Sequence, residues 1–159
     1  MKAAAALVED LATRARARGL RLATAESCTG GMLAAAMTSL AGSSDWFERG
    51  YVTYSNTAKT AELGVPAALI ESAGAVSEAV ARAMALGARV RSGAAWAVAL
   101  TGVAGPGGGS ADKPVGTVWI AWAGPQGEVS ARCFHFVGDR AAVREQAVSA
   151  ALTGLIDAL

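Results

Sequence analysis

Residues 20–31 read Leu-Arg-Leu-Ala-Thr-Ala-Glu-Ser-Cys-Thr-Gly-Gly, and this stretch decides the fold class. The apolar run at 20–25 predicts a short buried strand, which stops at Glu26 and Ser27. The small residues after it permit a tight turn, and an apolar-periodic segment then continues to about residue 40. A strand, a tight turn and a helix in succession are typical of an active-site turn in an α/β protein.

The rest of the chain continues the alternation of helices and strands. Apolar periodicity and capping residues predict helices over residues 2–18, from about 66 to 72, from the Ser77 N-cap onwards and after the Asp139 N-cap. Strands are expected over residues 46–54, 95–101, 115–123 and 129–137, the last two joined by a hairpin turn. Early alternation with a late hairpin predicts a three-layer α/β/α sandwich with a mixed, largely parallel sheet. With 159 residues, no repeat and no long linker, residues 1–159 are expected to form a single domain.

The composition narrows the class of protein. It is 53% hydrophobic and 17% charged, which is too apolar for a disordered chain. No run reaches the roughly 18 consecutive apolar residues of a membrane-spanning helix. Glu9 and Asp10 interrupt the apolar N-terminus before a signal-peptide core can form, so we expect a cytoplasmic protein. The net charge of +1 offers no electrostatic basis for binding nucleic acid or a membrane.

Residues that commonly bind metals are scarce. The chain has two cysteines, Cys28 and Cys133, and one histidine, His135. The cysteines form no metal-binding pair, a disulfide framework is not indicated, and no carboxylates cluster, so we expect no metal site. Cys28 competes with Ser27 for the role of nucleophile, because a thiol attacks more readily than a hydroxyl. The only histidine lies in a strand between two phenylalanines and points to the opposite face, so we interpret Cys28 as a packing residue.

Ser27 stands where a strand gives way to a helix. At such a turn the free backbone N–H groups, here from Cys28 to Gly31, can stabilise an oxyanion or bind an anion. The same pattern suits an ordinary helix N-cap formed by Ser27 or Thr29, with glycines that permit close packing. The residues alone leave both interpretations open.

Lys59 follows the strand over 46–54, in a turn that Ser55 and Asn56 open. A serine nucleophile needs a group to accept its proton, and a neutral lysine does this in Ser–Lys hydrolases. Burial would lower the pKa of this lysine, and the hydroxyl of Tyr54 could relay the proton or hold the amine. The alternative is a surface lysine in a turn, which the spacing does not exclude.

Two further segments suit an anionic ligand. Residues 101–109 leave the end of a strand and are dense in glycine, as in loops that present backbone amides to phosphate, although they match no nucleotide-binding fingerprint. Arg140 lies at the start of the last helix, where the helix dipole disfavours cations, and such a misfit is consistent with a cation that faces a ligand phosphate; Arg144 lies one turn further on. A flexible connection and a pair of solvated arginines are the respective alternatives.

Six motifs occur in order along nearly the whole chain. They are TAESCTGG at 24–31, Tyr54-Ser55-Asn56 with Lys59, GAVSEAVA at 74–81, TGVAGPGGG at 101–109, KPVGTVWIA at 113–121 and GDRAAVR at 138–144. In this combination the sequence resembles the CinA C-terminal domain family. The resemblance implies an amidohydrolase that converts nicotinamide mononucleotide into nicotinate mononucleotide and ammonia.

The resemblance also implies roles for individual residues. It places the nucleophile on Ser27, the general base on Lys59 and a supporting tyrosine on Tyr54. The implied substrate-binding residues are Thr29, Gly30, Gly31, Asn56, Thr101, Gly102, Gly105, Gly107, Gly108 and Arg140, of which the first three would line the region of the carboxamide or oxyanion.

The implied chemistry requires no metal and no organic cofactor. The expected partner is a small nucleotide substrate, with no nucleic acid and no membrane, and the resemblance favours a homo-oligomer. Three alternatives stay open: a non-catalytic nucleotide-binding or interaction module on the same fold, an amidase for a different small amide, and a hydrolase that uses Cys28.

Overall fold

Five strands form one mixed sheet in the order β2–β1–β3–β4–β5 in the computed structural model, which describes residues 2–159. The strands are β1 (Leu22–Glu26), β2 (Phe47–Val52), β3 (Trp96–Gly102), β4 (Thr117–Ala123) and β5 (Val129–His135). Strand β1 pairs in parallel with both β2 and β3, whereas β4 pairs antiparallel with both β3 and β5. The expected mixed sheet with a parallel first part and a late hairpin is therefore confirmed.

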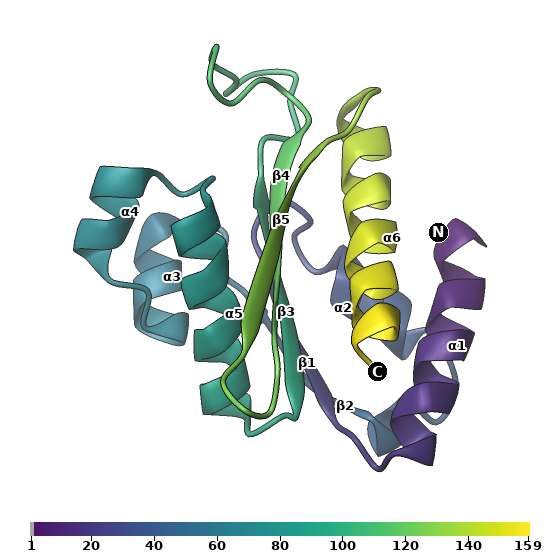
Figure 1. Ribbon diagram of the computed structural model, residues 1–159. Coiled ribbons are helices and arrows are strands. Elements are labelled where there is room, and N and C mark those ends of the chain that lie inside the picture. The colour runs from purple at the N-terminus through teal and green to yellow at the C-terminus, as the bar shows by residue number, and fades with distance from the viewer. Residues whose placement is uncertain (1) are drawn as a thin grey trace.

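Helices cover both faces of the sheet (Figure 1). They are α1 (Lys2–Ala17), α2 (Met32–Thr38), α3 (Asn56–Leu63), α4 (Ala67–Ala73), α5 (Glu78–Ser92) and α6 (Arg140–Ala158), with a short 3₁₀ helix η1 (Ser43–Asp45) before β2. Figure 1 shows α3, α4 and α5 on one side of the sheet and α1, α2 and α6 on the other. This arrangement is the expected three-layer α/β/α sandwich.

The two faces of the sheet carry side chains of different size. Towards α1, α2 and α6 the strands present Leu22, Val98, Leu100, Val118, Ile120 and Trp122, all of which are buried. Towards α3, α4 and α5 the fully buried strand residues of the second core are alanines, namely Ala23, Ala25, Ala97, Ala99, Ala121 and Ala123, while the larger Tyr51, Trp119 and Val129 are only partly buried on this face. Small side chains let a helix approach the sheet closely, so α5 packs directly over its centre.

Helix α5 illustrates how local sequence sets the ends of an element. Ser77 accepts a hydrogen bond from the backbone N–H of Val80, and Gly93 ends the helix in the left-handed conformation. Gly87 faces the backbone carbonyl of Leu63 so closely that a β-carbon would have no room. The absence of a side chain at this position therefore brings α5 against α3.

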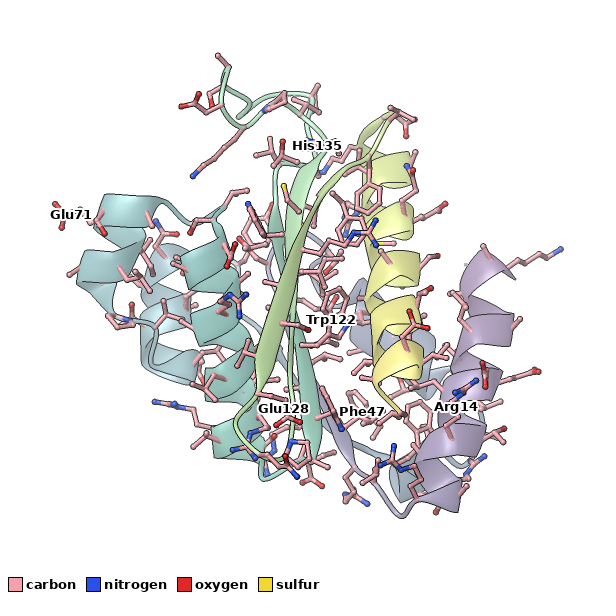
Figure 2. The ribbon with its side chains drawn as sticks, viewed as in Figure 1. Arg14, Phe47, Glu71, Trp122, Glu128 and His135 are labelled. Atoms are coloured by element: carbon pink, nitrogen blue, oxygen red, sulfur yellow. The ribbon has the colours of Figure 1, made fainter. Side chains whose placement is uncertain are left out.

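On the opposite face, α6 packs against one of the two tryptophans of β4. The ring of Trp122 points towards α6 (Figure 2), and its Nε1–H donates to the carbonyl of Ala151 at 3.1 Å. Gly154 leaves space for this ring. Burial of a large apolar side chain contributes about 2 kcal/mol, so this contact helps to fix α6 on the sheet.

The parallel strands end at a common edge of the sheet. The last residue of β1, Glu26, is paired with Val52 of β2 on one side and with Leu100 of β3 on the other. From β1 the chain runs to β2 on one side, and from β3 it runs to β4 on the other side. The connections that follow the neighbouring strands β1 and β3 therefore lead in opposite directions across the sheet. A crevice forms outside the carboxyl ends of strands at such a switch point, and ligands commonly bind there.

The structure also bears on membrane insertion. No helix within residues 2–159 combines the length and the hydropathy that crossing a bilayer requires.

Candidate active site

A cavity of about 320 Å³ lies at the carboxyl ends of β1 and β3. It is lined by Ser27, Cys28, Tyr54, Asn56, Lys59, Ala75, Val76, Thr101, Gly102, Val103, Ala104, Gly105, Gly107, Gly108 and Arg140. These include every site residue expected from the sequence except Thr29, Gly30 and Gly31. The structure thus brings five segments that are distant in sequence to one cavity.

The hydroxyl of Ser27 and the amine of Lys59 are in direct contact. Lys59 Nζ lies 3.0 Å from Ser27 Oγ. The lysine side chain is 1% exposed and Ser27 is 8% exposed. The amine also donates to the backbone carbonyls of Thr53 and Tyr54, each at 3.1 Å. A surface lysine in a turn, the alternative that the spacing left open, is therefore excluded.

The surroundings of Lys59 favour its neutral form. Burial lowers the pKa of Lys59, and only the nearby Cys28 acts weakly in the opposite direction. None of the ion pairs formed within residues 2–159 includes this amine. A neutral amine has two N–H donors and one lone pair, and the carbonyls of Thr53 and Tyr54 match the two donors. In the structure Lys59 Nζ also donates to Ser27 Oγ, and Ser27 Oγ donates to the carbonyl of Tyr54 at 3.4 Å, so the serine proton reaches the lone pair of a neutral amine only after the hydroxyl turns away from this carbonyl.

Lys59 lies in helix α3, so the prediction from the sequence that Ser55 and Asn56 open a turn carrying Lys59 is wrong. Ser55 is the N-cap of α3, and its Oγ accepts a hydrogen bond from the N–H of Ala58 at 3.1 Å. Gly64 ends the same helix in the left-handed conformation. An N-cap serine and a C-terminal glycine with eight residues between them are a helix signal, which the polar sequence of this segment obscured. The helix places Lys59 on its buried face.

Glu26 occupies the helix end that the sequence suggested for a substrate oxyanion. Its carboxylate is fully buried and accepts three hydrogen bonds. Thr29 Oγ1 donates at 2.6 Å, and the N–H groups of Leu33 and Ala34 donate at 2.8 and 3.0 Å. A carboxylate beside the first turn of a helix also interacts favourably with the helix dipole. The N-terminus of α2 is therefore closed by the protein itself.

Thr29, Gly30 and Gly31 accordingly do not line the cavity, in contrast to the expectation. The hydroxyl of Thr29 is held by Glu26, and the N–H of Gly30 donates to the carbonyl of Ser27 at 3.0 Å. Gly30 and Gly31 have φ angles of 58° and 104°, so they serve to turn the chain into α2. Within the described chain, the backbone N–H groups of Cys28 and Thr29, the two residues that follow Ser27, have no protein acceptor.

Arg140 and Tyr54 meet at the rim of the cavity. Arg140 Nη1 donates to the carbonyl of Gly105 at 2.9 Å, and Nη2 donates to the hydroxyl of Tyr54 at 3.2 Å. The tyrosine is 58% exposed, so its ring stands at the mouth of the cavity while its backbone carbonyl contacts the buried amine. Arg140 thus connects the glycine-rich loop to the end of β2.

Cys28 lies in an environment that suppresses thiolate formation. It is 5% exposed, and burial raises the pKa of its thiol to about 11. His135 is exposed on β5 (Figure 2) and contacts Cys133, not Cys28. Cys28 is therefore a poor nucleophile near neutral pH, as the sequence suggested.

Several lining residues were not expected from the sequence. Ala75 and Val76 lie just before α5, and the carbonyl of Ala75 accepts a hydrogen bond from Thr101 Oγ1 at 2.9 Å. Val103 and Ala104 belong to the loop that follows β3. The motif at 74–81 was the available signal for the first pair, but apolar residues carry no chemical indication of a site.

The described part of the chain holds no group of three or more histidine, cysteine, aspartate or glutamate residues that could bind a metal ion.

Comparison with known proteins identifies the family. Residues 4–159 match the CinA C-terminal domain. A Pseudomonas putida protein named nicotinamide-nucleotide amidohydrolase PncC is 55% identical over 153 residues, which cover 94% of this chain and 95% of that protein. The protein of the same name from Escherichia coli strain K12 is 52% identical over 149 residues, covering 94% and 90%.

Solved structures agree with this assignment. The crystal structure of competence damage-inducible protein A from Klebsiella pneumoniae superposes with a TM-score of 0.93 at 41% identity, covering 97% of this chain and 95% of that one. The competence/damage inducible protein CihA from Agrobacterium tumefaciens superposes with a TM-score of 0.89 at 46% identity, covering 95% and 94%. The chain that carries this buried Ser27–Lys59 contact belongs to the CinA C-terminal domain family.

Proposed function

We propose that this protein is an amidohydrolase that cleaves the carboxamide of a nicotinamide nucleotide, releasing ammonia and the corresponding nicotinate nucleotide. The observation that carries the proposal is the 3.0 Å contact between Ser27 Oγ and the buried amine of Lys59. The names of the relatives from Pseudomonas putida and Escherichia coli support the choice of substrate.

In the first half-reaction, Ser27 Oγ attacks the carboxamide carbon while its proton passes to the neutral amine of Lys59. The new C–O bond leaves negative charge on the carboxamide oxygen. The free backbone N–H of Cys28, which lines the cavity beside Ser27, is the proposed donor for that charge. The C–N bond then breaks, and the leaving nitrogen takes the proton from the Lys59 ammonium and departs as ammonia.

In the second half-reaction, water attacks the ester formed on Ser27. Lys59, neutral again, accepts a proton from this water and returns it to Ser27 Oγ as the C–O bond to the serine breaks. The product is the nicotinate carboxylate. One lysine therefore serves as base and acid in turn, because it changes charge in each half-reaction.

The nucleotide phosphate is proposed to bind at the rim of the cavity. Arg140 is the cation among the rim residues, and its guanidinium suits the geometry of a phosphate. The neighbouring loop contributes Gly105, Gly107 and Gly108, where the backbone is accessible to a ligand. Asn56 and Thr101 also line the cavity and are proposed to contact the ribose or the ring.

We propose a direct proton transfer between Ser27 and Lys59. The two atoms are already at hydrogen-bond distance, whereas the hydroxyl of Tyr54 is bonded to Arg140 at the cavity mouth. The contribution of Tyr54 is then its carbonyl, which helps to hold the amine of Lys59. A relay through the phenol would require this side chain to leave Arg140.

The test is ammonia release from nicotinamide mononucleotide. Ser27→Ala is expected to abolish release, and Lys59→Met to reduce it by about 10⁴-fold or more, because the triad-like residues of serine hydrolases act as one unit. Cys28→Ala serves as the matched control at the adjacent position and is expected to retain most of the activity. Undiminished release by Ser27→Ala would disprove the mechanism.

A non-catalytic nucleotide-binding module on the same fold predicts a different result. Such a protein would bind nicotinamide mononucleotide in calorimetry but release no ammonia from it. Release from a different small amide at a higher rate would assign another substrate to the same catalytic pair.

A further inference from the structure

Arg144 contacts the turn that carries Ser27, although it does not line the cavity. Its Nε donates to the carbonyl of Cys28 at 3.1 Å, and its Nη2 donates to the carbonyl of Thr29 at 3.2 Å. The side chain extends from the second turn of α6 and is partly buried. Two consecutive carbonyls immediately after Ser27 are thus held by one planar guanidinium, more than 100 residues away in sequence.

Holding a carbonyl also fixes the N–H group of the same peptide unit. A trans peptide is planar, and its N–H points opposite to its C=O. The bond from Arg144 to the carbonyl of Cys28 therefore directs the N–H of Thr29 away from the guanidinium. The bond to the carbonyl of Thr29 fixes the next peptide unit, whose N–H donates to the carbonyl of Ser27. These contacts set the orientation of the backbone on which Ser27 Oγ depends.

Glu26 holds the same turn by a different group. Its buried carboxylate accepts from Thr29 Oγ1 at 2.6 Å, while Arg144 takes the carbonyl of Thr29 at 3.2 Å. The carboxylate of Glu26 therefore accepts from the hydroxyl of this turn, whereas the guanidinium of Arg144 donates to the carbonyls of the turn. Neither charge contacts Ser27 itself, so both act through the backbone.

We propose that Arg144 is a positioning residue for Ser27: its guanidinium, through the carbonyls of Cys28 and Thr29, holds the turn so that Ser27 Oγ stays against Lys59 and the adjacent N–H groups stay available. This inference rests on the proposed function for its kinetic consequence, but not for its effect on the reactivity of Ser27. The proposed role of Arg144 differs from that of Arg140, which lines the cavity and is proposed to bind the phosphate.

The test compares Arg144→Met, Arg144→Lys and a control, Glu145→Ala, which alters an exposed neighbour on α6. The first measurement is the rate at which phenylmethanesulfonyl fluoride modifies Ser27, followed by intact mass and peptide mapping. This reagent needs no nucleotide site, so the reactivity of Ser27 is assessed even if the proposed substrate is wrong. The second is kcat and KM for ammonia release from nicotinamide mononucleotide, and thermal unfolding confirms that each variant is folded.

Arg144→Met is expected to slow modification of Ser27 at least roughly tenfold and to lower kcat about 100-fold with little change in KM, because misplacement of a reacting group lowers the rate of chemistry. Arg144→Lys is expected to recover part of the loss, because an ammonium can hold one carbonyl but not both in the fork geometry. Glu145→Ala should behave as the wild type.

Two outcomes would overturn the proposal. One is modification of Ser27 in Arg144→Met at the wild-type rate. The other is a rise in KM with unchanged kcat, which would make Arg144 a substrate-binding residue. If Arg144→Met does not fold, Arg144→Lys decides the question. Modification of Ser27 in Arg144→Lys at the wild-type rate would equally contradict a role for the contact with the two carbonyls.

Discussion

The amine of Lys59 lies 3.0 Å from the hydroxyl of Ser27, although 32 residues separate them in sequence. The contact arises because β1 and β2 are parallel neighbours and end at the same edge of the sheet. Ser27 follows β1 directly, and Lys59 lies on the helix that begins shortly after β2. The sheet topology thus places the proposed base, Lys59, beside the proposed nucleophile, Ser27. Helix α3, which carries Lys59, helps to bury the amine away from solvent.

The activity is expected to depend on pH through Lys59. Burial lowers the pKa of Lys59 below its ordinary value of 10.5, and only the neutral amine accepts the proton of Ser27. The ratio kcat/KM for ammonia release should therefore rise with pH and level off below pH 10.5. The measurement is a pH–rate profile with nicotinamide mononucleotide. A profile that is flat from pH 5 to pH 10 would contradict a lysine base.

The stability of the protein is expected to depend on the same group. Because the pKa of Lys59 is lower in the folded than in the unfolded chain, the unfolded chain binds more protons between the folded pKa and 10.5. The contribution of Lys59 to the free energy of unfolding therefore increases as pH rises through this window. Urea unfolding of the wild type and of Lys59→Met should show a difference in stability that shifts in favour of the wild type towards pH 10. Parallel stability profiles would mean that the amine is not perturbed by folding.

Cys28 should be chemically inert in the folded protein. Burial raises the pKa of its thiol to about 11, whereas Cys133 is only partly buried. Iodoacetamide at pH 8 is expected to modify Cys133 first and to leave Cys28 unmodified until the protein is unfolded, because the thiolate is the reactive form. Peptide mapping by mass spectrometry distinguishes the two. Rapid modification of Cys28 with parallel loss of activity would instead revive Cys28 as a candidate nucleophile.

Arg140 is expected to discriminate between substrates with and without a phosphate. Loss of a charge-assisted contact should raise KM of Arg140→Met for nicotinamide mononucleotide by roughly ten- to a hundredfold. The phosphate-free nicotinamide riboside offers no such contact, so its KM should be similar for the two enzymes. An equal effect on both compounds would show that Arg140 acts through Tyr54 or Gly105, its present partners.

Glu26 is expected to contribute strongly to stability. Its fully buried carboxylate accepts from one hydroxyl and two backbone N–H groups. Glu26→Gln places an amide NH₂ where an acceptor is needed, so the free energy of unfolding should fall by about 2 kcal/mol. Thr29→Val, which removes only one of the three bonds, should cost about 1 kcal/mol. Urea denaturation gives both values, and an unchanged stability of Glu26→Gln would contradict the role of the carboxylate.

Much of the fold could be predicted from local sequence. The strand before Ser27, the helix that Ser77 caps and the helix that Asp139 caps were all indicated by periodicity and capping residues, which act over a few neighbouring positions. The helix carrying Lys59 was missed because its short, polar sequence has little apolar periodicity. Its N-cap serine was read as part of a turn.

The composition of the cavity was also largely predictable, but its internal contacts were not. Ordered motifs named Ser27, Lys59 and Arg140 among the lining residues. They did not indicate that Glu26 closes the end of α2, that the phenol of Tyr54 contacts Arg140, or that Arg144 holds the turn after Ser27. Each of these contacts joins groups whose direction depends on side-chain torsions and neighbouring elements.

The sequence by itself therefore determined which residue types are present and which short segments become strands, turns and capped helices, because these depend on nearest neighbours along the chain. Only the tertiary structure decided whether Lys59 is a solvated cation or a buried amine beside Ser27. Its state of charge depends on burial by α3 and the sheet, and on the carbonyls of Thr53 and Tyr54. Burial is a property of the assembled layers, and so is the reactivity that follows from it.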